Sequence, residues 1–114
     1  MTVISVEAKL ITVINVFTVE PTNQQELLDL LDKATVDVMQ HVDGFISANF
    51  HKGIDGKTVI NYAQWRGQKA FEAMMENPEA QKHMNEAAKL ATKVEPHLCE
   101  VESVFFAPSA LLMP

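Results

Sequence analysis

Two asparagines and the only tryptophan of the chain are the residues best suited to chemistry. Asn15 lies within the apolar run ITVINVF, and Asn61 precedes Trp65 by four residues in INYAQW. A buried carboxamide without a hydrogen-bond partner costs about 1–3 kcal/mol. Two such amides beside a Trp therefore predict a polar floor in an apolar pocket, a recurrent form of small-molecule site. The alternative is that each Asn bonds a strand edge or a neighbouring helix end.

Two histidines and a stripe of Met and Phe are further candidates for the lining of this pocket. His51 alternates with Asn49 and Ser47, so it either joins the polar lining or caps a sheet edge; His83 follows Pro78 by about one helical turn. Both also fit an ordinary surface or structural role. The stripe suits either plain core packing or a deformable wall around a flat aromatic ligand, and comprises Phe71, Met74, Met75, Met84 and Leu90.

Several other chemistries find no support in the sequence. His, Cys, Asp and Glu show no metal-ligand spacing, and neither a phosphate-binding glycine loop nor a serine nucleophile elbow is present. Cys99 reads as a small buried hydrophobe in a strand. A net charge of −6 with nine Lys and Arg argues against nucleic acid or an anionic membrane as partner. No secretory signal or membrane-spanning run is seen, so a cytoplasmic protein is expected.

The elements that must position these residues follow from periodicity and from turn residues. A length of 114 residues with 47% apolar residues fits one domain, 1–114, with a core of about 9–107. Alternating β-branched residues predict strands, three- and four-residue apolar spacings predict helices, and Asp55-Gly56 predicts a hairpin turn. The predicted elements are a strand at 9–20, a helix from Thr22 or Asn23 to about His41, strands at 45–52 and 57–66, a helix at 68–77 bent at Pro78 and resumed to about Lys93, a last strand at 98–107 and an apolar tail at 108–114.

This order, β-α-β-β-α-β, predicts an α+β fold of the ferredoxin-like type. Alternation places Asn15 with Val13 and Phe17, and Asn61 with Trp65, on the side that the helices cover. The opposite sheet face is apolar as well, and a soluble monomer would not expose it. The sequence therefore predicts a homodimer packed through this face, which carries Leu10, Ile14, Val16, Ile46, Phe50, Ile60 and Tyr62.

The stretch GFISANFHKGIDGKTVINYAQW, residues 44–65, together with the strand before it and the helix after it, resembles the antibiotic biosynthesis monooxygenase (ABM) domain family. The likeness spans about 11–105 and is most specific in NYAQW. It is greatest to the small quinone-forming monooxygenases that oxidise anthrones. The resemblance implies a dimeric α+β barrel that oxygenates an activated phenolic or polycyclic aromatic substrate with O2 and uses no metal, flavin or haem.

The resemblance also implies roles for individual residues. Asn61 and Asn15 would hydrogen-bond the substrate oxygen or a peroxide, and Trp65 would pack the ring system and donate its indole N–H. Two positions depart from the family pattern. Phe71 stands where the actinorhodin-type members have a Tyr, and no Arg occurs near Lys82–Asn85, which leaves His83 as the only substitute for a proton relay.

Two alternative functions remain open at this point. A ligand-binding or stress-associated protein of the same fold, without turnover, would explain the missing Tyr and Arg. Haem-degrading monooxygenases of this fold use an Asn, a Trp and an iron-ligating His, which Asn15, Trp65 and His83 resemble. The His of this chain is offset by about one residue, which turns a side chain by roughly 100° around a helix.

Overall fold

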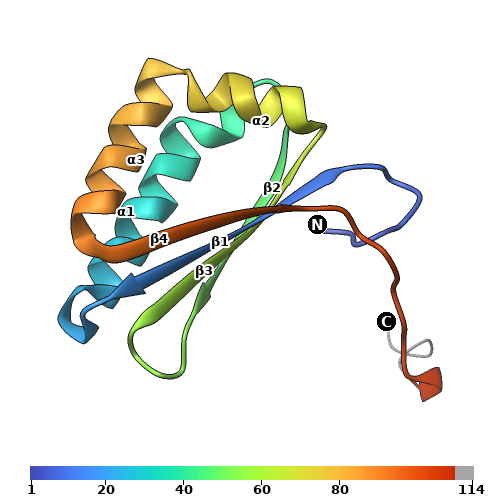
Figure 1. The fold of residues 1–114 in the computed structure, drawn as a ribbon, viewed down its shortest axis with the longest axis horizontal. Helices are drawn as coiled ribbons and strands as arrows, with labels where there is room; N and C mark the ends of the chain where they lie inside the picture. The colour runs from blue at the N-terminus through green and yellow to red at the C-terminus, as the bar shows by residue number, and fades with distance from the viewer. Residues whose placement is uncertain (110–114) are drawn as a thin grey trace.

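A four-stranded antiparallel sheet forms the centre of the computed structural model, which describes residues 1–109 (Figure 1). The strands are β1 (Ile11–Val19), β2 (Phe45–Lys52), β3 (Thr58–Trp65) and β4 (Ala91–Cys99), in the spatial order β2-β3-β1-β4. β2 and β3 form the hairpin predicted at Asp55-Gly56, where Gly56 has a φ of 79°. The predicted ferredoxin-like order of elements is confirmed.

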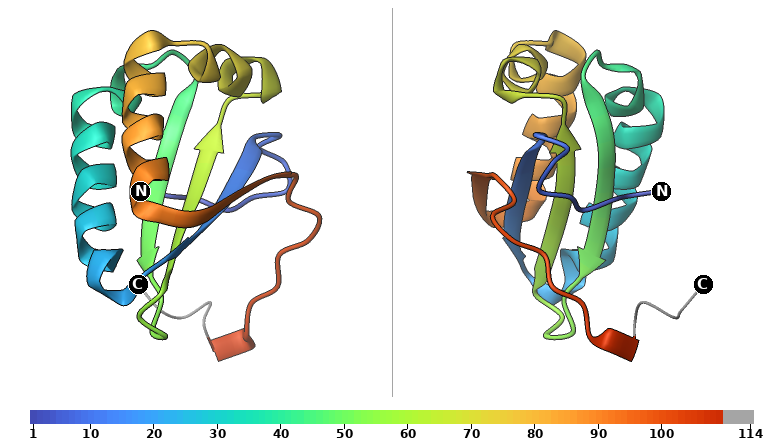
Figure 2. Two further views of the ribbon diagram at one scale, coloured as in Figure 1. Left: turned by 60° about the vertical axis from the view of Figure 1, so that its left-hand side comes forward. Right: turned by 90° about the vertical axis from the view of Figure 1, so that its right-hand side faces the viewer.

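The helices lie on one face of this sheet (Figures 1 and 2). They are α1 (Gln24–Asp37), α2 (Gln68–Met75) and α3 (Pro78–Leu90), with short 3-10 turns at Pro21–Asn23 and Met39–His41. The predicted break at Pro78 separates α2 from α3. Asn77 Oδ1 caps α3 by accepting bonds from the backbone N–H groups of Glu79 at 2.9 Å and Ala80 at 3.2 Å. Within residues 1–109, no helix is long and apolar enough to cross a membrane.

The last strand differs from the prediction. β4 begins directly after α3 at Ala91 and ends at Cys99. The sequence had predicted this strand at 98–107, because that run is apolar. β4 pairs only with β1, so Pro96 is tolerated in it because an edge strand does not need every backbone N–H. Residues 100–109 leave the sheet and extend away from the domain, with Phe105 89% exposed (Figure 1). Residues 110–114 of the predicted tail lie outside the described part of the chain.

A bulge in β2 corrects the predicted faces of that strand. The register with β3 shifts between Phe45 and Ser47, and an extra residue at a bulge breaks the two-residue alternation. Phe45 and Phe50 consequently both lie on the helix side, although one has an odd and the other an even number. Phe50 was predicted on the face away from the helices, and His51 was a candidate for the helix side. Because of the bulge, Phe50 lies on the helix side and His51 on the other face.

The face of the sheet away from the helices, here called the outer face, is partly covered by the N-terminal segment. Figure 2 shows residues 1–8 passing across the strands. Thr2 Oγ1 donates to Asn49 Oδ1 at 2.7 Å, and Gln64 Nε2 donates to the carbonyl oxygen of Val3 at 2.8 Å. Ile46 remains 48% exposed on β2, and Val3 is 61% exposed. The outer face is therefore neither bare nor fully buried within one chain.

Two separate apolar clusters fill the space between sheet and helices. The first cluster surrounds Phe17 and Val59, and the second surrounds Val13 and Ala63. Asn15 lies between Phe17 and Val13 along β1, and Asn61 lies between Val59 and Ala63 along β3. The two predicted polar residues thus mark the boundary between two cores.

Candidate functional site

A cavity of about 680 Å³ opens between the sheet and the helices at this boundary. The volume is within the range of about 300–1,000 Å³ that small-molecule sites occupy. We call it the central cavity. It is lined by Val13, Asn15, Phe17, Leu31, Ala34, Thr35, Met39, Phe45, Ala48, Phe50, Asn61, Ala63, Trp65, Phe71, Met74, Met75, Gln81, His83, Met84, Asn85, Ala87, Ala88, Val94, Pro96 and Leu98.

Asn15 and Asn61 form the polar floor of the central cavity. They are direct partners in the antiparallel pairing of β1 with β3, and directly opposed residues have Cβ atoms about 4.5–5.5 Å apart. Asn61 Oδ1 accepts a hydrogen bond from the backbone N–H of Asn49 at 3.3 Å. Asn15 Oδ1 is buried and has no hydrogen-bond partner among the described residues. The floor thus holds one amide that is fixed and one that is unsatisfied.

Trp65 closes one side of the cavity. Its side chain is only 3% exposed and packs edge-on against two phenyl rings. The ring centroid of Phe45 lies 5.5 Å away at an interplanar angle of 89°, and that of Phe71 lies 6.1 Å away at 70°. Such edge-to-face pairs are favourable because the positive ring edge meets the negative ring face. The three rings make a rigid aromatic wall, against which a planar ligand can pack.

The helices supply the remaining wall and its polar groups. Phe71, Met75, Met84 and His83, four of the candidate lining residues, all line the cavity. Met74 is buried, whereas Met75 is 42% exposed. Among the described lining residues, His83 is the only one with a titratable side chain. Its imidazole is therefore the one lining group of the type that serves as a general acid or base.

Sequence reasoning missed the contribution of β4 and of the corner between α2 and α3. Val94 and Leu98 line the cavity and are 38% and 44% exposed, so the cavity opens beside the edge strand. The misplaced last strand concealed them, although the alternation of Val94 with Leu98 was a usable signal. Gln81 Nε2 donates to the Met75 carbonyl oxygen at 3.0 Å and ties α3 to the end of α2; no sequence pattern indicated this bond.

His51 is not brought to the cavity. It follows Phe50, which points to the helix side, so its own side chain lies on the outer face. The ring is exposed, and its Nδ1 lies 3.0 Å from the carbonyl oxygen of Asn49. His51 is thus separated from Asn15, Asn61 and Trp65 by the thickness of the sheet.

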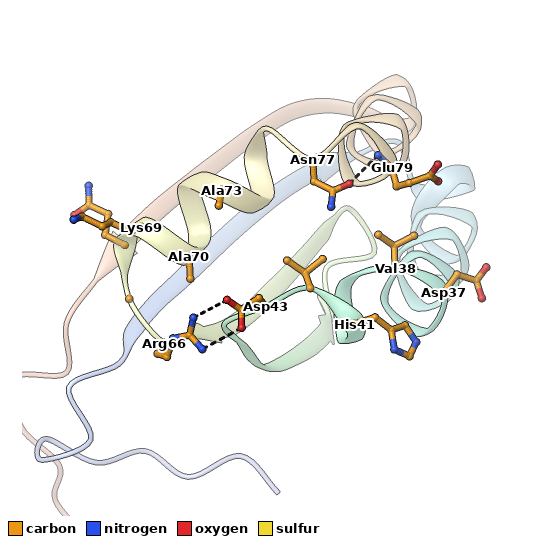
Figure 3. A pocket seen from close by; sticks show the side chains of 13 residues that line it. Asp37, Val38, His41, Asp43, Arg66, Lys69, Ala70, Ala73, Asn77 and Glu79 are labelled. Atoms are coloured by element: carbon orange, nitrogen blue, oxygen red, sulfur yellow. Dashed lines mark hydrogen bonds and ion pairs between the residues drawn. The ribbon is translucent and has the colours of Figure 1, made fainter.

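A second hollow lies on the surface between α2 and the connection from α1 to β2 (Figure 3). It is broad and open, at about 1100 Å³. Arg66 donates to both carboxylate oxygens of Asp43, at 3.2 and 2.9 Å. This contact lowers the pKa of Asp43 and raises that of Arg66. In this hollow the charges of Arg66 and Asp43 already neutralise each other, and both side chains are exposed. The central cavity is therefore the better candidate for a functional site.

Metal chemistry finds no donor set in this site. Within residues 1–109, no group of three or more His, Cys, Asp or Glu side chains could hold a metal ion. The polar side-chain groups of the central cavity are amides, the Thr35 hydroxyl, an indole and one imidazole. These groups can donate and accept hydrogen bonds to a flat apolar molecule that carries a few oxygen atoms.

A ferredoxin-like sheet that closes an apolar cavity over an amide floor defines a class of small-molecule-binding α+β domains. The antibiotic biosynthesis monooxygenase family model matches residues 10–86. The chain belongs to this family, as its resemblance predicted.

Two kinds of relative support the assignment. Tetracenomycin-F1 monooxygenase of Streptomyces glaucescens is 42% identical over 109 residues, which are 96% of each chain. The monooxygenase from the ActVA-Orf6 gene of Streptomyces coelicolor, solved with nanaomycin D, has a TM-score of 0.81 at 22% identity and covers 91% of this chain and 99% of its own. SnoaB of Streptomyces nogalater, a cofactor-independent oxygenase, has a TM-score of 0.73 at 19% identity, covering 83% and 95%. The last two likenesses show the shared fold.

Proposed function

We propose that this protein is a cofactor-independent monooxygenase that oxidises a phenolic, anthrone-like polycyclic substrate to a quinone with O2. The observation that carries the proposal is the central cavity, with paired amides on its floor and an aromatic wall beside them. The relative from S. glaucescens, named for its action on tetracenomycin F1, supports an aromatic polyketide as substrate. The volume of about 680 Å³ suits a molecule of three or four fused rings.

The chemistry needs no group beyond substrate and O2. An anthrone loses a proton from its CH2 carbon to give an electron-rich enolate, which passes an electron to O2. Recombination forms a C–O bond and, after protonation, a hydroperoxide on that carbon. Loss of the second C–H proton with cleavage of the O–O bond releases water and leaves the quinone carbonyl. One O2 is consumed for each quinone, with one oxygen atom in the product and the other in water.

Each floor and wall residue has a role in these steps. The carboxamide NH2 of Asn61 donates to the substrate carbonyl oxygen and stabilises the negative charge that develops on the enolate. Asn15 bonds a neighbouring substrate oxygen or the peroxide. Trp65, packed against Phe45 and Phe71, holds the ring plane of the substrate and donates its indole N–H. Orientation and exclusion of water account for the remaining acceleration.

His83 is the residue that we assign to proton transfer. It is half-buried on α3 and is the only titratable described side chain of the cavity lining. Phe71 cannot exchange a proton, so it serves as part of the aromatic wall against Trp65. The polar residues Gln81 and Asn85 share the lining near His83 in sequence. A proton removed from the substrate can leave through the imidazole to solvent.

We also propose that two copies pair through the outer face. Ile14, Val16 and Ile60 on this face are only half-buried within one chain. Phe105 and Phe106, on the segment that leaves the domain, are 89% and 65% exposed. Large apolar side chains exposed in this way often mark a surface that another chain covers. Sedimentation should give a dimer, and a monomer at micromolar concentration would contradict this part of the proposal.

Oxygen uptake with dithranol, a simple dihydroxyanthrone, tests the proposed activity. The purified protein should be colourless, consume one O2 per quinone formed and need no added metal or flavin. Haemin should give no sharp Soret shift, which separates this activity from haem degradation. Asn61→Ala should lower kcat by roughly 10²-fold, the loss typical of one oxyanion donor. Asn23→Ala, at a helix start where the side chain makes no capping bond, is the matched control. No uptake with any anthrone, together with tight binding of an unrelated ligand, would favour a non-catalytic binding protein.

A further inference from the structure

The amide of Asn61 is held in one orientation by the neighbouring strand. Its Oδ1 accepts from the backbone N–H of Asn49 at 3.3 Å. A carboxamide whose oxygen is engaged presents its two N–H donors, because the oxygen and nitrogen lie on opposite sides of the group. Asn61 also lines the central cavity. The cavity floor therefore offers the substrate a donor, and the backbone of β2 determines that polarity.

Asn49 is itself anchored from the outer face of the sheet. Its Nδ2 donates to the carbonyl oxygen of Tyr62 at 2.9 Å and to Ser47 Oγ at 3.3 Å. Its Oδ1 accepts from Thr2 Oγ1 at 2.7 Å. Tyr62 follows Asn61 directly on β3, so the side chain of Asn49 bridges its own strand to the residue beside the amide. The N–H that holds Asn61 is thus fixed by contacts on the other side of the sheet.

We propose that Asn49 is a positioning residue for the oxygenation site, which it reaches through the sheet from the outer face. Its side chain fixes the backbone N–H that keeps Asn61 turned as a donor toward the substrate oxygen. This inference rests on the proposed function, in which Asn61 binds that oxygen. A preorganised donor stabilises developing charge because it does not have to reorient during the reaction. Loss of the Asn49 side chain should therefore reduce turnover more than substrate binding.

A double-mutant cycle with dithranol tests the coupling. Asn49→Ala should lower kcat by about tenfold with KM changed less than twofold, and should add nothing in the Asn61→Ala background. Thr2→Val, which removes one outer bond and leaves that to Tyr62, should cost less than Asn49→Ala. Asn49→Asp keeps the acceptor for Thr2 but cannot donate to Tyr62, so it should lose as much as Asn49→Ala; it decides the outcome if the alanine variant fails to fold.

An NMR measurement reads the same geometry without turnover. The two side-chain N–H signals of Asn61 are assigned as the pair that is present in the ¹⁵N–¹H spectrum of the wild-type protein and missing from that of Asn61→Ala. In the Asn49 variants this pair should move toward the position of exposed, freely rotating amides, while Asn23→Ala leaves it in place. Independent, multiplying losses of kcat, or an unmoved Asn61 pair, would overturn the inference. Absence of any anthrone oxidation would instead defeat the proposed function, and the NMR result would still stand.

Discussion

Asn15 and Asn61 face each other across the β1–β3 pairing, at the boundary between two apolar cores. The two amides are not equivalent. Asn61 is bonded through its oxygen to β2, whereas Asn15 has a buried oxygen without a partner among the described residues. A buried acceptor without a partner destabilises the ligand-free protein. A ligand that donates a hydrogen bond to Asn15 Oδ1, once the carboxamide has rotated toward it, would remove this destabilisation.

Replacing Asn15 by Leu should separate stability from activity. Leu has a similar volume and no polar atom, so removal of the unsatisfied acceptor should raise the free energy of unfolding by about 1 kcal/mol. The same change should lower kcat/KM for dithranol by about tenfold, since a substrate hydroxyl loses its acceptor. Thermal unfolding and oxygen uptake measure the two effects. A less stable variant, or one with full activity, would show that Asn15 is an ordinary structural residue.

Trp65→Phe should preserve the packing of the wall and remove the indole N–H. The two edge-to-face contacts, with Phe45 and Phe71, can be retained by a phenyl ring of smaller area. We expect a modest fall in melting temperature and a loss in kcat/KM of about tenfold, the value of one good hydrogen bond. Because Trp65 is the only Trp, quenching of its fluorescence by an anthraquinone product should report binding in the wild-type protein. An unquenched Trp would place the ligand elsewhere.

His83→Gln should produce a defect that depends on pH. Gln retains hydrogen bonding but cannot accept a proton, so kcat should fall by about 10²-fold near neutral pH, the lower range for general-base catalysis. The loss should shrink as the pH rises, because the substrate then ionises in solution without help from the protein. A pH–rate profile of both proteins makes the comparison. Parallel profiles would assign His83 to packing instead of proton transfer.

Gly44→Ala should destabilise the connection between α1 and β2. Gly44 has a φ of 87°, and a Cβ built there would overlap the Cβ of Ala70 on α2. The matched control is Gly56→Ala, which has a φ of 79° and open space around it. The backbone conformation alone costs about 1–2 kcal/mol for a residue with a Cβ. Gly44→Ala should cost clearly more than Gly56→Ala in denaturant unfolding; equal costs would show that α2 shifts to accommodate the methyl group.

Much of the fold could be predicted because it depends on local patterns. β2 has the predicted bounds, and the faces of β1 and β3 follow from alternation. The last strand was misplaced because this edge strand contains Lys93, Glu95 and Pro96. Such residues are more typical of a loop than of a strand. The bulge at Phe45–Ser47 could not be predicted, since it depends on pairing with β3. It reversed the assignment of His51.

The candidate site was predictable in part for the same reason. Alternation placed Asn15, Asn61 and Trp65 on one side of the sheet, but not the volume between them. That volume depends on how far α3 lies from the strands, which is decided by contacts between distant parts of the chain, such as the packing of Met84 against the cluster of Val13 and Ala63. The orientation of Asn61 required the position of the Asn49 backbone, which no sequence pattern gives.

The division of the interior into two cores has a consequence for how such a protein can change. Phe17 and Val59 belong to one core and Val13 and Ala63 to the other, and Phe17, Val13 and Ala63 also line the cavity between them. Gln81, Asn85 and Leu98 line the same cavity but belong to neither core, so substitutions at these positions can change its shape and polarity without disturbing either core. One scaffold can therefore acquire new aromatic substrates by drift in a few lining positions, while its thermal stability stays nearly constant.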